Sequence, residues 1–164
     1  MMNFRIGNGI DVHKLQFGES LIIGGIKIKS NSGVVGYSDG DVGIHALVDS
    51  ILGALSIGDI GQYFPSSDKK WENSNSKIFL EFALKKMNSL GYKINNIDLT
   101  IMLQTPSIRL YNKKIRENLS SLCNIKLNQI SLKATTTDNL GFLGRKDGIA
   151  AIATILLIND GNKN

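Results

Sequence analysis

Two histidines and an acidic residue beside one of them are the side chains of this sequence with the clearest metal chemistry. Asp11 and His13 lie in the segment GNGIDVHKL, which predicts a β-strand, and side chains two residues apart on a strand point to the same face. His45, the other histidine, lies in a segment of helical period that can pack against this strand. Two histidines and one carboxylate, with a coordination position left open, form the ligand set expected of a catalytic Zn²⁺ site, and other divalent metals are compatible with it. Taken singly, a histidine is more often a hydrogen-bonded structural residue, so the spacing alone leaves both interpretations open.

Three loop segments add groups that suit a phosphorylated ligand. The motif SDGD begins at Ser38, before the helix, where free N–H groups and the helix dipole attract phosphate oxygens; capping of the helix by Ser38 or Asp39 explains the same residues. The motif KATTTD offers three hydroxyls to phosphate and ends at Asp138, which can hold a divalent cation, unless the segment is an ordinary strand end. GFLGRKDG offers Arg145 as a bidentate anion clamp or forms a surface turn. Together these segments favour a phosphorylated substrate held between two cations.

A mixed set of strands and helices must position these groups. In one predicted helix, Asp41, His45 and Asp49 fall on a stripe that borders the apolar face. Gly91 is expected just after the end of the next helix. The predicted strands are 3–13, 20–29 (with a glycine pair that indicates a bulge), 95–103, 129–135 and 149–158; the predicted helices are 41–56, 75–90 and about 109–122; 30–41 and 58–74 are predicted loops. We therefore predict one α+β domain (an α/β-type sandwich), residues 1–164, with a sheet of about four or five strands and three helices on one face.

Composition narrows the class of protein. Hydrophobic residues make up 42% and charged residues 20% of the chain, which is typical of a globular domain. No apolar run approaches the roughly 18 residues of a membrane span, and the N-terminus lacks the pattern of a signal peptide, so no membrane partner is expected. The lysines are scattered and aromatic residues are only 7%, which argues against nucleic acid as a partner. Cys123 is the single cysteine, which suits a reducing, intracellular compartment and a structural thiol.

Five segments, taken in order, carry a resemblance to a known family. They are GxDVH, SDGDVxxHAxxD, GDIGxxFP, KATTTxxLGFxGR and a closing apolar strand. No single segment is unique, but together, in order and spacing from about residue 5 to residue 158, the sequence resembles the 2-C-methyl-D-erythritol 2,4-cyclodiphosphate synthases. The resemblance implies a homotrimer with active sites between subunits, in the cytoplasm of a bacterium or in a plastid stroma.

The resemblance also implies a reaction and a substrate with a cytidine diphosphate group. A 2-phosphate attacks the β-phosphorus of the cytidine diphosphate ester, which releases CMP and closes a cyclic diphosphate. This phosphorus–oxygen lyase step belongs to the non-mevalonate route to isoprenoid precursors. An intramolecular phosphoryl transfer requires two aligned phosphates and neutralised charge rather than a protein nucleophile, and metals and hydroxyl donors supply both.

Individual roles follow from the resemblance, position by position. Asp11, His13 and His45 match the zinc ligands, and Asp138 matches the acid that binds a second ion, Mg²⁺ or Mn²⁺. Thr136 matches a transition-state stabiliser, and Tyr37 occupies the position of a second catalytic group. The implied substrate-binding residues are Ser38, Asp59, Ile60, Gly61, Phe64 and Asp68 around the methylerythritol group, Leu103, Gln104, Thr105, Pro106, Ser107, Ile108, Arg109 and Thr135 around the cytidine, and Phe142 and Arg145 near the trimer axis.

Four positions depart from the family pattern. Tyr37 stands where the family usually has His; it can donate a hydrogen bond but carries no positive charge near neutral pH. Asp138 replaces the usual Glu and is one methylene shorter, while Ser66 and Ser107 stand where Asp and Lys are common. Two other classes of protein stay open: a metal-dependent phosphoesterase that activates water, and a non-catalytic trimeric nucleotide-binding protein with a structural metal.

Overall fold

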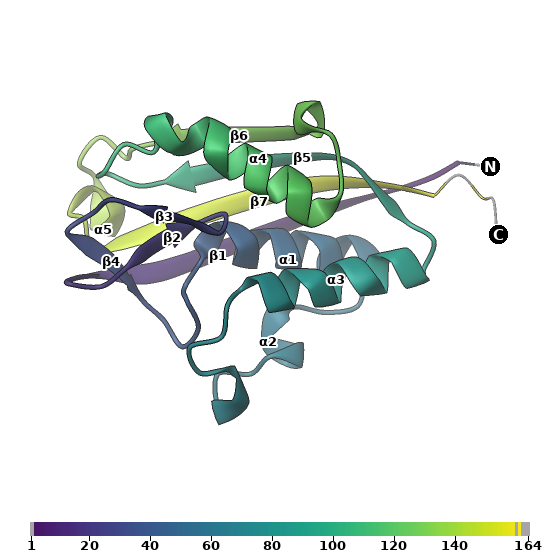
Figure 1. Ribbon diagram of the computed structural model, residues 1–164, viewed down its shortest axis with the longest axis horizontal. Helices are drawn as coiled ribbons and strands as arrows, with labels where there is room; N and C mark the ends of the chain where they lie inside the picture. Colours follow the sequence, from purple (N-terminus) through teal and green to yellow (C-terminus); the bar gives the residue numbers. More distant parts are fainter. Residues whose placement is uncertain (1, 160, 162–164) are drawn as a thin grey trace.

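The computed structural model describes residues 2–159 and 161 and contains a five-stranded sheet with helices on one face (Figure 1). The order of strands is β4-β1-β7-β5-β6, and all neighbours are antiparallel except the parallel pair β5–β6. These strands are β1 (Asn3–Phe17), β4 (Ser32–Val35), β5 (Lys93–Met102), β6 (Ile130–Thr135) and β7 (Gly148–Asn159). The predicted α+β class and sheet size are confirmed, while the single domain 1–164 stays a prediction whose ends lie outside the described residues.

Three long helices cover one face of the sheet, and a small hairpin lies beside them (Figure 1). The helices are α1 (Val42–Leu55), α3 (Lys77–Ser89) and α4 (Asn112–Cys123), and the hairpin pairs β2 (Leu21–Ile23) with β3 (Ile26–Ile28). Short helices α2 (Ile60–Tyr63) and α5 (Gly141–Gly144) and three 3₁₀ turns (Lys69–Trp71, Arg109–Tyr111 and Leu127–Gln129) occupy the connections. Within the described residues, no helix has the length and apolarity needed to cross a bilayer.

Helix α1 is the centre of the core and lies unusually close to strand β1. Twelve of its fourteen residues are buried, because the sheet covers one side and other helices cover the rest. Two glycines of β1 allow the contact: a Cβ atom at Gly7 would lie 1.8 Å from the backbone oxygen of Ser50, and one at Gly9 would lie 2.0 Å from that of Ala46. Only a strand without side chains at these positions lets the helix backbone approach so closely. The same contact brings His45 next to the residues that follow Gly9.

The opposite face of the sheet carries several large apolar side chains on β1 and β7 and is not covered by any described element. Strand β1 alternates: residues such as Gly9 and Leu15 point to the helices, while Phe4, Ile6 and Ile10 point away and are 56%, 72% and 59% exposed. On the neighbouring strand β7, Ile10 is paired with Ile152 and Ile6 with Leu156, so the apolar surface continues across the sheet. We call this surface the open face.

Four local predictions were wrong. The segment 58–74 was expected to be a loop, but it contains α2 and the 3₁₀ turn Lys69–Trp71. The segment 30–41 was expected to be a loop, but it contains β4, whose Val34 is buried and pairs with Leu15. The glycine pair in 20–29 forms the turn of the β2–β3 hairpin rather than a bulge, because Gly24 and Gly25 both have positive φ (58° and 75°). The N-cap of α1 is Asp41, not Ser38 or Asp39. The predicted end of α3 is confirmed, since Gly91 follows the C-cap with a φ of 75°.

Candidate metal centre

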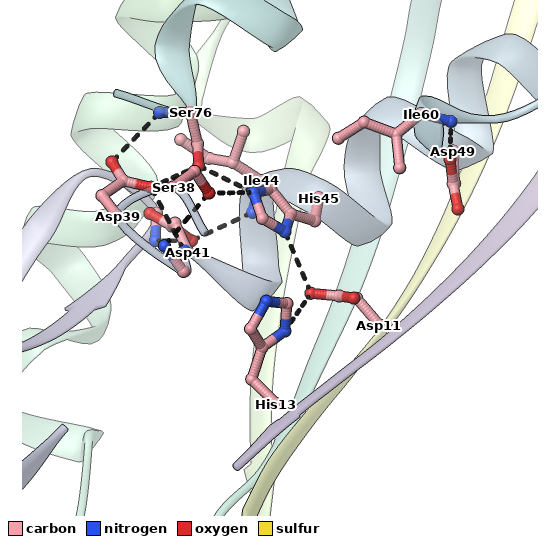
Figure 2. Close-up of polar contacts among 12 residues, drawn as sticks. Asp11, His13, Ser38, Asp39, Asp41, Ile44, His45, Asp49, Ile60 and Ser76 are labelled. Atoms are coloured by element: carbon pink, nitrogen blue, oxygen red, sulfur yellow. Dashed lines mark hydrogen bonds and ion pairs between the residues drawn. The ribbon is translucent and has the colours of Figure 1, made fainter. Parts of the chain in front are cut away.

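Asp11, His13 and His45 converge at one point between β1 and α1 (Figure 2). Asp11 Oδ2 lies 2.9 Å from His13 Nδ1 and 3.2 Å from His45 Nδ1. One ligand atom from each residue falls within 4.8 Å of the other two, the only such group of three metal-binding side chains in the described part of the chain. The strand alternation predicted for Asp11 and His13, and the packing predicted for His45, are therefore both observed.

The donor set fits a divalent cation. Asp11 Oδ2 and His13 Nδ1 are buried and, apart from the contacts among these three side chains, neither has a hydrogen-bond partner among the described residues, so their lone pairs can turn to an ion. Burial opposes ionisation of Asp11, but interactions with the rings of His13 and His45 outweigh it and lower the pKa of Asp11 to about 2. An ionised carboxylate beside two imidazole nitrogens is a ligand set for Zn²⁺ or a similar transition metal.

A cavity of about 210 Å³ opens onto this centre. Four of the residues that the resemblance singled out, besides the three ligands, line it: Tyr37, Ser38, Ile60 and Phe64. Ser66, one of the four departures from the family pattern, also lines it. Trp71 and Phe79 line it as well and were not predicted. The aromatic rings pack together, with centroids 4.9 Å apart for Phe64 and Trp71 and 4.6 Å apart for Phe64 and Phe79. The only sequence signal for Trp71 was that a large aromatic residue stood in a polar loop.

Tyr37 lines this cavity, and its hydroxyl forms no hydrogen bond with any described residue. The hydroxyl oxygen is buried. Its desolvation and the nearby carboxylates of Glu72 and Asp68 raise the pKa of Tyr37, so this side chain is a neutral donor at physiological pH.

Three of the residues predicted around the methylerythritol group, all in the segment 58–74, do not line the cavity. Asp59 caps α2 by accepting a hydrogen bond from Gln62 N–H at 3.0 Å. Asp68 accepts from Lys70 N–H at 3.0 Å and so caps the 3₁₀ turn Lys69–Trp71. Gly61 lies within α2.

The start of α1 carries a side-chain cap, as one of the two interpretations of SDGD expects, although the cap is Asp41; the phosphate interpretation stays a prediction. The buried Asp41 carboxylate accepts hydrogen bonds from the N–H groups of Ile44, Gly24 and Gly25, at 3.0, 2.9 and 2.6 Å. Burial raises the pKa of Asp41 to about 6 against the effect of these donors. The cap therefore satisfies the N–H of Ile44 in the first turn of α1 and also fixes the hairpin turn to the helix.

Most residues of the predicted cytidine segment line a second cavity, of about 160 Å³. It is lined by Leu103, Gln104, Pro106, Ser107, Ile108, Ala134, Thr135 and Thr136. Thr105 lines a neighbouring cavity, and Arg109 lines neither. The second cavity shares no lining residue with the cavity at the metal centre.

The remaining predicted residues lie near the end of β6 and around α5. Asp138 has a positive φ of 54° and is not part of the three-residue metal group. Phe142 is 43% exposed. Arg145 Nε donates to Asp147 Oδ2 at 3.0 Å, so its charge is already partly balanced within the chain.

Fold and site together define a class of protein: a mixed-sheet domain with an Asp-His-His metal centre. Residues 4–158 match the model of the YgbB family, and the chain belongs to this family. A curated relative from Pseudoalteromonas atlantica (strain T6c / ATCC BAA-1087) is named 2-C-methyl-D-erythritol 2,4-cyclodiphosphate synthase. It is 48% identical over 158 residues, which are 95% of this chain and 96% of the relative.

Solved structures agree with this assignment. The IspF structure from Plasmodium falciparum in complex with CDP is 41% identical, with a TM-score of 0.86, and the match covers 96% of this chain and 97% of that one. The bifunctional IspDF from Campylobacter jejuni is 36% identical, with a TM-score of 0.93; the match covers 97% of this chain but only 43% of that longer one. The resemblance described from the sequence is thus confirmed over nearly the whole chain.

Proposed function

We propose that this chain converts 4-diphosphocytidyl-2-C-methyl-D-erythritol 2-phosphate into 2-C-methyl-D-erythritol 2,4-cyclodiphosphate and CMP. The observation that carries the proposal is the convergence of Asp11, His13 and His45 at the floor of a cavity, in a chain whose near-full-length relatives bear the name of this synthase. The reaction needs little covalent help from protein side chains, because both reacting groups belong to one substrate.

The three side chains at the cavity floor would hold Zn²⁺ or another divalent transition metal. When bound, such a metal supplies positive charge to phosphate oxygens and orients them. Around it, the hydroxyls of Ser38 and Tyr37 are placed to donate hydrogen bonds to a phosphate in the cavity. The apolar wall of Ile60 and Phe64, together with Trp71 and Phe79, would exclude water from the methylerythritol group.

The second cavity would take the cytidine part of the substrate. Its apolar residues, such as Leu103 and Ile108, suit the base, and its Thr135 and Thr136 hydroxyls suit the ribose and diphosphate. Asp138, two residues after Thr136, would hold Mg²⁺ or Mn²⁺ against the diphosphate oxygens. Phe142 and Arg145 would lie near the axis of an oligomer.

We further propose a homotrimer in which each active site is shared by two subunits. The open face supports this, because a large exposed apolar surface on a sheet is typical of a protein–protein interface. The separation of the two cavities supports it as well: within one chain they share no residue, so a neighbouring subunit would supply the second cavity to the first. The proposed location is the cytoplasm of a bacterium or a plastid stroma, and the buried, unpaired Cys123 fits a reducing compartment.

Phosphorus NMR of the protein with the proposed substrate and Mg²⁺, before and after chelation, tests this function. The expected products are a cyclic diphosphate and CMP, lost on chelation and restored by zinc with magnesium. Linear hydrolysis products would instead establish a metal-dependent phosphoesterase. Nucleotide binding without any new phosphorus signal would establish a non-catalytic binding protein.

A further inference from the structure

The ring of His45 contacts polar groups through both of its nitrogen atoms (Figure 2). One nitrogen faces Asp11, and the other faces the hydroxyls of Ser76 and Ser38. The Nδ1 atom of the ring faces Asp11 at 3.2 Å, while its Nε2 atom lies 2.8 Å from Ser76 Oγ. Ser76 Oγ donates a hydrogen bond to Asp39 Oδ1, and the backbone N–H of Ser76 donates to Asp39 Oδ2 at 3.0 Å. Ser76 is fully buried, at the start of α3.

The direction of these hydrogen bonds determines where the imidazole proton lies. An ionised carboxylate only accepts, and a serine hydroxyl has one proton to give. Because Ser76 gives that proton to Asp39, its oxygen can only accept from His45. Nε2 of His45 must then carry the proton, and Nδ1 keeps the lone pair that a metal requires.

We propose that Ser76 and Asp39 are positioning residues for the metal centre, which hold the ring of His45 and its proton so that Nδ1 points at the metal. The proposal rests on the proposed function only in requiring that a divalent metal binds there. It connects three elements: Asp39 in the segment before α1, His45 on α1 and Ser76 at the start of α3. Such outer partners typically change metal affinity by about 10–100-fold when removed.

Ser38 is the competing partner of the same ring nitrogen. Its Oγ lies 3.2 Å from His45 Nε2, a longer contact than that of Ser76, and it accepts from Gly40 N–H at 3.3 Å. Among the described residues no carboxylate accepts the proton of Ser38, so this hydroxyl can turn to either role. Ser38 also lines the cavity, where it is available to substrate. Ser76, in contrast, is fixed by burial and by Asp39.

The variant Ser76→Ala tests the proposal with little disturbance, because the backbone N–H of Ser76 still bonds Asp39. We expect the Kd for Zn²⁺, measured by competition with a chromophoric chelator, to rise at least about 10-fold. Ser50→Ala is the matched control: its hydroxyl is also fully buried on α1 but donates to Leu47 O, so the Kd should change less than about twofold. Ser76→Thr, which keeps the hydroxyl, should recover most of the affinity. An unchanged Kd in Ser76→Ala, or an equal loss in Ser38→Ala or Ser50→Ala, would overturn the proposal.

A measurement on the unaltered protein avoids any question of folding. The chain has only two histidines, so long-range ¹⁵N–¹H NMR of the zinc-loaded full chain distinguishes His13 from His45. We expect His45 to carry its proton on Nε2, and a proton on Nδ1 with the metal on Nε2 would contradict the proposal. If the unaltered protein binds neither zinc nor another divalent transition metal, the proposed function fails; if it binds zinc but Ser76→Ala binds equally well, only this inference fails.

Discussion

The two faces of the sheet both carry apolar side chains, and the open face also carries polar ones such as Asn8 and Asp98, yet the structure uses the two faces differently. Strand β1 contributes to both, because its side chains alternate. Its residues on the covered face include Gly7, Gly9, Asp11, His13 and Leu15, and its residues on the open face include Phe4, Ile6, Ile10 and Val12. On the covered face small residues admit α1 and polar residues meet it, whereas on the open face bulky residues meet no other described element.

The candidate metal ligands of β1 and the exposed apolar residues of our proposed subunit contact therefore lie on opposite faces of one strand. The covered face gains a buried site because two glycines let the backbone of α1 approach, so that the ligand from the helix reaches the ligands from the strand. The open face keeps large side chains exposed, which is costly for a monomer and favourable for an interface. A period of two residues therefore decides whether a β1 side chain faces the candidate metal centre or the open face, where we propose the subunit contact.

The largest expected effect comes from removing a ligand on the covered face. In His13→Ala, a two-ligand site remains, and we expect activity to fall by at least about 10³-fold, because electrostatic stabilisation of the phosphates is lost. The assay is the phosphorus NMR experiment, with zinc content measured by mass spectrometry. Lys14→Ala, one residue along and exposed, should retain its zinc. Loss of zinc in Lys14→Ala but not in His13→Ala would contradict the assignment of the two faces.

The second effect concerns the close approach of helix and strand. In Gly9→Ala, the new Cβ would lie 2.0 Å from a backbone oxygen of α1, which cannot move without shifting the helix. We expect a loss of about 3 kcal/mol in the free energy of unfolding, at the upper end of overpacking costs. Thermal or urea unfolding at fixed protein concentration measures it.

Asn8→Ala is the control for this prediction, since Asn8 points to the other face and donates to Thr154 Oγ1 at 3.0 Å and to Ala153 O at 3.2 Å. It should cost only about 1–2 kcal/mol, the typical value of one or two hydrogen bonds. Equal costs for the two variants would show that the glycine is not required for close packing.

The third effect tests the open face. Ile10→Lys places a charge in its apolar centre, and we expect the association constant of the subunits to fall at least about 10-fold, while the folded monomer changes by less than about 0.5 kcal/mol. Analytical ultracentrifugation over a range of concentrations measures both the state and the constant. Ile78→Lys is a matched control on α3, because Ile78 is similarly exposed, at 45%, on the helical side. Dissociation in both variants, or in neither, would remove the open face as the interface.

The positions of the metal-ligand candidates on β1 and α1 were predicted better from the sequence than the elements around them. The spacing of Asp11 and His13 and the helical position of His45 are local signals, and each stays valid once the strand and helix form. β4 was missed because it has four residues in a segment rich in glycine and serine, and its pairing with β1 depends on the rest of the sheet.

The residues around the ligands were harder to predict for a related reason. Ser76 looks like a common N-cap, and its side chain makes no capping bond; it meets His45 only because α3 starts beside α1. Trp71 and Phe79 reach the cavity through packing on Phe64, which no spacing in the sequence encodes. Asp41 was expected on a stripe that borders the apolar face of the helix, but tertiary contact with a hairpin turn made it a buried cap.

The smallest expected effect concerns an ion pair on β5 and β6, and it tests how far the proposed subunit contact extends across the open face. There, Lys133 Nζ lies 2.7 Å from Asp98 Oδ2, and this hydrogen bond lowers the pKa of Asp98. A pKa lowered in the folded state contributes stability that is present above the ordinary value of 3.8 and is lost as the pH falls through the folded value. Because both side chains are largely exposed, the contribution should be about 0.5 kcal/mol.

A double-mutant cycle with Asp98→Asn and Lys133→Gln, measured at pH 7 and again below the folded pKa, isolates this pair. We expect a coupling of about 0.5 kcal/mol at pH 7 that vanishes at the lower pH and does not depend on protein concentration. The other carboxylate oxygen, Asp98 Oδ1, is buried and has no hydrogen-bond partner among the described residues. If a second subunit supplied that partner, the coupling would be larger and would grow with protein concentration. The subunit contact would then reach beyond β1 and β7, and the contrast between the two faces would hold for the whole sheet.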